Sequence, residues 1–347
     1  MIHKSNQLTN HLNLDFQPHP LARSPHFQTI VSSAFRNKGA AMCRAAREMI
    51  LEAGEGVQLQ GFYSPQPDSS SKGLVLLLHG WLGHANASYN IAIGEYLYQH
   101  GYAIFRLNLR DHGDTHHLNS GLFRGDLLDE AFAAVQHIAQ LASDDPFYII
   151  GSSLGGNFAA RLAWRHSQTP LPNLTQTLAI SPAFNPYHTT LTLDSGPPFY
   201  LAYFRRKWRR SFIKKKAAHP ALYDFSEVLA APTCIAMTEA FVRRFSPYDS
   251  PQAYFDSYAV TPAMLATLQT PVTIITAVDD PVVPVSDFDT FRNLTPYLQL
   301  SIQPYGGHVG FIDLFPFRRW VGQAALAVLE KTKPPTPTLP SPSQGEG

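Results

Sequence analysis

Six short apolar runs recur along the chain, and segments of helical composition separate them. The runs cover residues 74–78, 102–109, 147–150, 177–180, 272–276 and 298–303. A run without polar alternation is typical of a strand that is buried on both faces, as in a parallel sheet. The helical segments are residues 88–100, 125–142, 153–166, 286–294 and 313–330. This order predicts an α/β fold with a mostly parallel, doubly wound sheet that binds ligands at the carboxyl ends of its strands.

An antiparallel hairpin is predicted ahead of the parallel strands. Residues 48–52 and 57–63 alternate or run apolar on either side of a Gly-Glu-Gly turn at residues 54–56. This is the pattern of two strands joined by a short turn. The chain before the hairpin, residues 1–40, is mixed in composition and is predicted to be an irregular segment without a defined element.

The alternation of strand and helix is interrupted between residues 185 and 270. This stretch contains the basic sequence FRRKWRRSFIKKK and a run rich in proline and tyrosine, SPYDSPQAYFDSYAVTP. Because it lies between two predicted strands of the sheet, it can form a helical cap over an active site. We therefore divide the chain into the irregular segment 1–40, a core in two parts, 41–184 and 271–332, the cap 185–270, and a disordered tail 333–347 that is rich in proline and serine.

The charge and cysteine content argue against several classes of protein. The 347 residues carry a formal net charge of +1, which gives no reason to expect a nucleic-acid partner. Two cysteines, Cys43 and Cys234, predict neither a disulfide framework nor a structural zinc site. The amino terminus lacks the apolar core of a secretory signal, and no stretch reaches the roughly 18 apolar residues of a transmembrane helix. We expect a cytoplasmic protein.

The apolar run at residues 147–150 leads directly into Gly-Ser-Ser-Leu-Gly at residues 151–155, and helical composition follows. The pattern G-x-S-x-G between a strand and a helix is that of a nucleophile elbow, in which a strained turn exposes the serine hydroxyl. We expect glycine at 151 and 155 because a Cβ there would clash with the neighbouring strand or helix. Ser153 is therefore the candidate nucleophile; the alternative is an ordinary glycine-rich turn.

A serine hydroxyl needs a base to take its proton, and histidine suits this role near neutral pH. His308 follows the last predicted strand in the glycine-flanked sequence YGGHVGF and is the candidate base. Asp280, in the sequence AVDDP after the strand at 272–276, is the candidate acid that orients the imidazole. Asp279 remains the alternative, since one residue of register decides which carboxylate points inward. The chain order is Ser, Asp, His.

Acyl transfer also needs hydrogen-bond donors for the oxyanion. The sequence LHGWLG at residues 78–83 closes the first parallel strand, which should lie beside the strand that carries Ser153. We expect the backbone N–H groups of Trp81 and Leu154 to form the oxyanion hole, each contributing about 3 kcal/mol in the transition state. We interpret His79 as structural rather than catalytic.

These residues, in this order, resemble the α/β-hydrolase superfamily and, in detail, its YheT-like branch, the AB hydrolase 4 family. The motifs that carry the resemblance are PHFQTI at 25–30, HGWLGHANASY at 79–89, NLRDHGDT at 108–115, GSSLGGN at 151–157, AVDDP at 277–281 and GGHVGF at 306–311. The resemblance implies the α/β-hydrolase fold with Ser153 as nucleophile, Asp280 as acid and His308 as base. It also implies hydrolysis of carboxylic esters without a cofactor. The chain departs from the family at Asp111, where a glycine usually follows the arginine, and in the cap.

We expect a serine hydrolase that cleaves carboxylic esters of short or medium acyl chains through an acyl-enzyme. A small molecule or a lipid-like ester, such as a monoacylglycerol, is the expected substrate, and no obligate protein partner is implied. Acyl transfer to an alcohol other than water remains an alternative, because the same triad serves both reactions. A binding protein that keeps the fold without turnover is a further alternative, although it would be expected to lack a triad member.

The basic cluster from Arg205 to Lys216 has two interpretations. Anionic lipid headgroups attract such clusters, at about 1 kcal/mol per charge, so contact with a membrane surface is one. The other is a solvated helix face that covers the cap. The overall neutrality of the chain favours the second interpretation.

Overall fold

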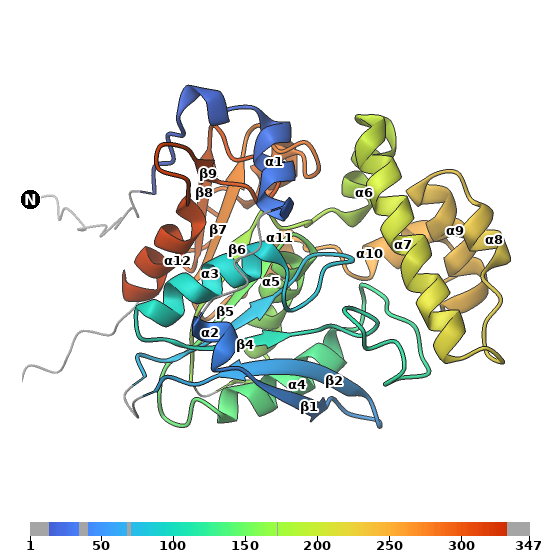
Figure 1. Ribbon diagram of the computed structural model, residues 1–347, viewed down its shortest axis with the longest axis horizontal. Helices are drawn as coiled ribbons and strands as arrows, with labels where there is room; N and C mark the ends of the chain where they lie inside the picture. Colours follow the sequence, from blue (N-terminus) through green and yellow to red (C-terminus); the bar gives the residue numbers. More distant parts are fainter. Residues whose placement is uncertain (1–13, 35–40, 68–70, 172, 332–347) are drawn as a thin grey trace, which may run out of the picture.

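The computed structural model describes residues 14–34, 41–67, 71–171 and 173–331. Figure 1 shows a central twisted sheet with helices on both faces and a group of helices beyond one end of its strands. The predicted disordered tail, 333–347, lies outside the described residues, as do parts of the predicted irregular segment, 1–13 and 35–40.

The sheet has the strand order β1-β2-β4-β3-β5-β6-β7-β8. Its strands are β1 (Arg47–Glu52), β2 (Gln58–Ser64), β3 (Leu74–Leu78), β4 (Ala103–Leu107), β5 (Phe147–Ser152), β6 (Leu174–Ile180), β7 (Val272–Ala277) and β8 (Leu298–Gln303). The pairs β1–β2 and β2–β4 are antiparallel, and all other neighbours are parallel. The predicted hairpin and the mostly parallel α/β sheet are therefore confirmed.

Helices cover both faces of the sheet, which explains why the strands carry no polar alternation. Leu74, Leu76 and Leu78 of β3 pack in one apolar cluster with α4 (Leu128–Gln140) and α5 (Leu154–His166). Val75 and Leu77 point the other way, into a second cluster with α3 (Ser88–Gln99) and α12 (Trp320–Lys331). Alternate residues of a strand face opposite sides, so every position of β3 is buried.

Two predicted helices differ from the structure. Residues 286–294 contain a 3₁₀ helix, η2 (Val285–Phe291), instead of an α-helix. Its buried Phe288 and Phe291 are three residues apart, a spacing that matches three residues per turn. In the segment 313–330 the helix begins only at Trp320, after two short strands, β9 (Ile312–Asp313) and β10 (Arg318–Arg319). Pro316 lies between these strands, and its ring and missing N–H would break a helix there.

The segment 1–40, for which no element is predicted, contains a helix. After η1 (Pro20–Ala22), α1 covers Pro25–Ala34, and a short helix α2 (Ala41–Arg44) follows. Gln28 of α1 is fully buried, and its amide donates to the carbonyls of Ala22 and Ile312 and accepts from the N–H of Ile312. Contacts with a distant part of the chain, rather than local sequence preference, hold α1 in place.

The chain between β6 and β7 forms the group of helices beyond the sheet (Figure 1). They are α6 (Pro186–Ser195), α7 (Pro198–Ala218), α8 (Ser226–Ala230), α9 (Cys234–Phe245) and α10 (Pro251–Asp256). Aromatic side chains join them: Phe212 of α7 packs against Phe225 and Phe241, with ring centroids 4.7 and 6.0 Å apart. We call α6–α10 the helical insertion. The last helix of this stretch, α11 (Pro262–Leu265), packs against α5 and η2 of the core instead.

Lys215 of α7 ties the helical insertion to the loop that follows β4. Its side chain is 1% exposed, and the ammonium donates to Asp111 Oδ1 at 2.7 Å and to the carbonyls of Asn119 and Gly121. Burial lowers the pKa of Lys215 and raises that of Asp111, although each charge favours the ionised form of the other. The pair therefore fixes the position of α7 against the loop after β4, and it adds little net stability.

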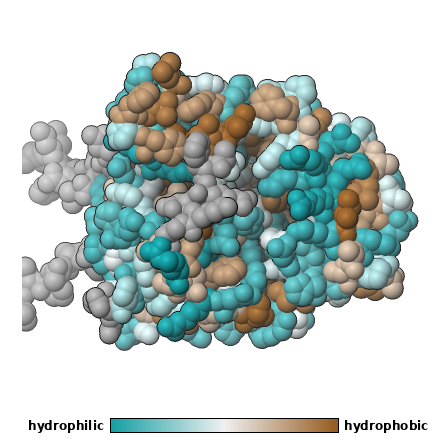
Figure 2. Space-filling model, in the orientation of Figure 1, coloured by the Kyte–Doolittle hydropathy of each residue, from teal (hydrophilic) through white to brown (hydrophobic). Residues whose placement is uncertain are grey.

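The basic cluster is thus divided between the interior and the surface. Lys215 is buried, whereas Arg206 and Arg210 are exposed, and Figure 2 shows mostly hydrophilic residues over the face where α7 lies. The solvated helix face stays the prediction for this surface, and contact with a membrane stays its alternative.

Removing one partner of a buried ion pair should destabilise the protein more than removing an exposed lysine beside it. We expect Lys215→Met to lower the free energy of unfolding by about 3–5 kcal/mol, because Asp111 is left buried and unpaired. Lys214 is the matched control, since it pairs with Asp114, whose side chain is 94% exposed. Lys214→Met should cost less than about 1 kcal/mol. Urea denaturation measures both, and equal losses would contradict this account of Lys215.

Candidate active site

Ser153 occupies a strained turn between β5 and α5. Its backbone angles are φ 56° and ψ −121°, a conformation that residues other than glycine rarely adopt. The two glycines permit the tight turn: a Cβ on Gly151 would lie 2.0 Å from the carbonyl oxygen of Gly155. A Cβ on Gly155 would lie 2.4 Å from the carbonyl oxygen of Leu78, in β3. The predicted reason for both glycines is confirmed.

His308 connects Ser153 to Asp280 through two hydrogen bonds. Its Nε2 lies 2.9 Å from Ser153 Oγ, and its Nδ1 lies 2.9 Å from Asp280 Oδ2. An ionised carboxylate can only accept, so Nδ1 carries the hydrogen and Nε2 is free to accept the serine proton. The side chain of Asp280 is fully buried and that of His308 is 10% exposed. The structure therefore brings the three predicted residues together.

The structure also separates the two neighbouring aspartates. Asp280 Oδ1 accepts from the N–H groups of Val282 and Val283, which leaves Oδ2 for His308. Asp279 points elsewhere, and its Oδ1 accepts from the N–H of Gly307 at 2.9 Å. Burial raises the pKa of Asp279. Asp280 contacts the histidine side chain, whereas Asp279 holds the loop that carries it.

Two further hydroxyl groups fix the backbone of the histidine loop. Thr29 Oγ1, from α1, accepts from the N–H of His308 at 2.9 Å. Ser181 Oγ, after β6, accepts from the N–H of Val309 at 3.2 Å. Sequence reasoning did not single out either residue, although Thr29 lies in the motif PHFQTI, which contributes to the family resemblance. Its place beside the histidine follows from the packing of α1.

The loop after β3 and the start of α5 place two candidate oxyanion donors beside Ser153. Among the described residues, neither the N–H of Trp81 nor that of Leu154 donates to a protein acceptor. Leu154 begins α5, where backbone N–H groups lack partners within the helix and the helix dipole is positive. Gly80 lies so close that a Cβ would be 3.1 Å from Ser153 Cβ. These features suit the binding of a negatively charged oxygen.

Two buried histidines hold the loop after β3 in shape. His112 Nε2 accepts from the N–H of Leu82, and its Nδ1 lies 2.7 Å from the carbonyl of Arg110. His79 bonds in the same way, with Nε2 accepting from the N–H of Leu109 and Nδ1 2.8 Å from the carbonyl of Gly80. Each ring must be neutral to accept at Nε2 and donate at Nδ1. This agrees with the interpretation of His79 as structural.

Burial keeps both imidazoles neutral. It lowers the pKa of His112 to about 4 and that of His79 well below its usual value. Sequence reasoning did not identify the role of His112. Its side chain reaches a loop about thirty positions earlier in the chain, at Leu82, and no local pattern reveals that contact.

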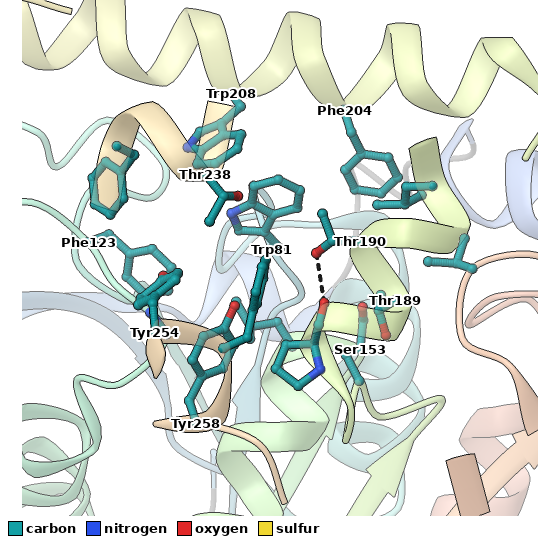
Figure 3. Close-up of a pocket in the computed structure, with 18 residues that line it drawn as sticks. Trp81, Phe123, Ser153, Thr189, Thr190, Phe204, Trp208, Thr238, Tyr254 and Tyr258 are labelled. Atoms are coloured by element: carbon teal, nitrogen blue, oxygen red, sulfur yellow. Dashed lines mark hydrogen bonds between the residues drawn. The ribbon is translucent and has the colours of Figure 1, made fainter. Parts of the chain in front are cut away.

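Two pockets meet at Ser153. The first, of about 80 Å³, is bounded by the helical insertion and by the loop after β3. In Figure 3, Phe204 and Trp208 reach down from α7 while Thr189 and Thr190 approach from α6. The second, of about 400 Å³, lies between α1, the start of α7 and the histidine loop. Trp81 and Phe204 border both pockets.

The described residues contain no group of three or more histidine, cysteine, aspartate or glutamate side chains arranged to hold a metal ion. In the same part of the chain, no helix combines the length and the apolar character needed to cross a bilayer.

Comparisons with known proteins show the family and the fold. A family model described as the alpha/beta hydrolase fold matches residues 73–313. A Synechocystis protein named as a candidate esterase is 26% identical over 290 residues, which cover 76% of each chain. YheT of Escherichia coli, also named as a candidate esterase, is 21% identical over 83% of this chain and 84% of its own. A solved esterase structure from Pyrococcus furiosus superposes with a TM-score of 0.58 at 16% identity, covers 93% of this chain and 99% of that one, and supports the fold alone.

The buried His112 should make the protein less stable in mild acid. Its pKa is about 4 in the folded protein, against an ordinary value of 6.5. Between these values the unfolded chain binds more protons, so stability falls as the pH falls. Lowering the pH from 7 to 5 should remove about 2 kcal/mol of unfolding free energy through this residue.

His112→Gln should reduce this pH dependence, measured by urea denaturation at pH 7 and pH 5. His137→Gln is the control, because His137 is exposed on α4 and should leave the dependence unchanged. Identical pH dependences in wild type and His112→Gln would show that His112 does not titrate on unfolding.

Proposed function

The chain belongs to the α/β-hydrolase fold family and is similar to its YheT-like members, and we propose that it cleaves carboxylic esters as a serine hydrolase. The observation that carries the proposal is the chain of two 2.9 Å hydrogen bonds from Ser153 through His308 to Asp280. The esterase names of its relatives support ester hydrolysis in general. The catalytic triad and the acyl-enzyme are part of what we propose.

In the first half of the proposed reaction, Ser153 Oγ attacks the ester carbonyl carbon while its proton passes to His308 Nε2. Asp280 accepts the Nδ1 hydrogen bond and stabilises the imidazolium that forms. The carbonyl oxygen becomes negatively charged and is bound by the N–H groups of Trp81 and Leu154. Because the strained turn and the buried carboxylate hold their positions before substrate arrives, little reorganisation is needed in the transition state.

In the second half, the tetrahedral intermediate collapses and the bond to the alcohol oxygen breaks. His308 gives its proton to that oxygen, and the alcohol leaves an acyl group attached to Ser153. A water molecule then gives a proton to His308 and attacks the acyl carbon. Collapse of this second intermediate returns the proton to Ser153 and releases the acid.

Acyl transfer is a second candidate, favoured by the size of the pocket beside His308. That pocket, of about 400 Å³, has room for an alcohol acceptor in place of water. Adding glycerol to the assay and following acyl-glycerol against free acid would separate the two reactions. A binding protein without turnover fits less well, because the three side chains of the triad are already hydrogen-bonded.

Ser153→Ala should abolish labelling by a fluorophosphonate and lower the turnover of p-nitrophenyl esters by roughly 10⁴ to 10⁶. The substitution removes the attacking oxygen and introduces no larger group. Labelling is followed by mass spectrometry of intact protein. Labelling that persists in the variant would mean that another residue is the nucleophile.

Asp280→Asn should lower kcat by about 10⁴, because an amide at this position favours the wrong tautomer of His308. Asp279→Asn is the matched control, since its amide oxygen can still accept from the N–H of Gly307. We expect the control to lose less than about tenfold. Steady-state kinetics on p-nitrophenyl butyrate measures both. A larger loss of kcat in Asp279→Asn than in Asp280→Asn would mean that Asp279 is the aspartate that orients His308.

A further inference from the structure

The two pockets at Ser153 expose different parts of the catalytic machinery. Leu154, which carries a candidate oxyanion donor, borders the first pocket but not the second. His308 borders the second but not the first. We call the first the aromatic pocket, since six aromatic side chains border it alone: Phe123, Trp208, Phe241, Tyr254, Phe255 and Tyr258. We call the second the histidine-side pocket.

This asymmetry decides which part of an ester occupies which pocket. His308 must reach the alcohol oxygen to protonate it as it leaves, so the alcohol has to lie on the side of the imidazole. The acyl chain extends from the other side of the same carbonyl carbon. We propose that the aromatic pocket binds the acyl chain and the histidine-side pocket binds the alcohol, an assignment that rests on the proposed ester hydrolysis.

The aromatic pocket limits the acyl chain. Its free volume is about 80 Å³, against about 400 Å³ for the histidine-side pocket. Three of the side chains that line it are tightly packed: Leu193, Phe241 and Phe255 are 3%, 3% and 2% exposed. A wall of buried side chains cannot move aside without cost. The pocket therefore accepts short or medium chains and excludes long ones.

The histidine-side pocket carries a positive charge without a negative partner. Lys207 of α7 borders it, and no carboxylate of the described residues pairs with this lysine. Its ammonium lies 3.2 Å from Tyr203 Oη and 5.1 Å from the centre of the Tyr203 ring. Hydroxyl groups of Ser33 and Tyr203 belong to the same lining.

A cation among hydroxyl groups is suited to an anionic group on a polar alcohol. The substrate class that follows is a short or medium acyl ester of an alcohol that bears a phosphate or a carboxylate. Lys207 is then a specificity-determining residue, which binds the alcohol and takes no part in the chemical step.

The acyl assignment is tested with a substitution that fills the aromatic pocket. Thr190 of α6 borders this pocket and is half-buried, so Thr190→Phe should project into it. The next residue, Leu191, is 42% exposed and borders neither pocket, and Leu191→Phe is the matched control. We expect Thr190→Phe to lower kcat/KM for p-nitrophenyl hexanoate, relative to the acetate, by roughly 10- to 200-fold. Thr190→Leu gives a milder form of the same test if the phenylalanine variant does not fold.

The alcohol assignment is tested with two esters that differ by one phosphate group, 1-butanoyl-glycerol and 1-butanoyl-glycerol 3-phosphate. Lys207→Met should lower kcat/KM for the phosphate ester by about tenfold more than it lowers kcat/KM for the neutral ester. Arg210→Met is the control, because Arg210 is exposed on the same helix and borders neither pocket. The preference of wild type for the phosphate ester should also shrink as salt is added. The carboxylate analogue, 3-butanoyl-glycerate, should lose the same preference in Lys207→Met if the lysine binds either anion.

The outcomes separate this inference from the proposed function. Absence of Ser153-dependent turnover on every ester would overturn the proposed hydrolase itself. Ser153-dependent turnover with unchanged acyl preference in folded Thr190→Phe or Thr190→Leu would overturn the acyl assignment. Equal charge preference in wild type, Lys207→Met and Arg210→Met would overturn the role of Lys207.

Discussion

The close approach of two backbones at the turn between β5 and α5 is the constraint on which the site depends. A side chain on Gly151 would collide with the carbonyl oxygen of Gly155. A side chain on Gly155 would collide with the carbonyl oxygen of Leu78. Glycine at both positions lets α5 begin directly above the end of the sheet. The tight turn strains the backbone at Ser153, whose positive φ is unfavourable for a residue with a side chain. This conformation points the Ser153 hydroxyl away from the strand and toward His308.

Buried polar contacts hold the other parts of the site in relation to this turn. Asp279 and Thr29 accept hydrogen bonds from the backbone of the histidine loop. These bonds hold the imidazole of His308 in one position. The neutral His112 does the same for the loop after β3. Each of these groups would be costly to leave unpaired in the interior, so the network has few alternative arrangements. The site is therefore a property of several loops that are fixed against one another.

The helical insertion determines the surroundings of the site. Lys215 fixes α7 to the loop after β4 by pairing with Asp111. Asp111 keeps a positive φ of 57° there, and its second oxygen accepts from the N–H of Phe123, which borders the aromatic pocket. A residue with a side chain at a positive φ thus supplies the partner of a buried lysine of the insertion. The shape of the aromatic pocket depends on this contact.

Local patterns were sufficient to predict the sheet, the hairpin and the identity of the residues that meet at Ser153. Strands buried on both faces leave uninterrupted apolar runs, and the strained turn leaves a pair of glycines around a serine. One omission occurred where local preference is weak, and one error occurred where a local signal, Pro316, was overlooked. Helix α1 is held by Gln28 through bonds to Ala22 and Ile312, and the helix predicted from residue 313 is interrupted near Pro316.

The sequence by itself determined the α/β fold and the candidates Ser153, Asp280 and His308, because strand burial and the turn impose patterns on neighbouring residues. Only the tertiary structure decided that Asp280 rather than Asp279 faces the imidazole, that Thr29 holds the backbone of His308, and that two pockets meet at Ser153. Those outcomes depend on side-chain direction and on contacts between residues far apart in the chain. Such contacts leave no periodic or local signal in a single sequence.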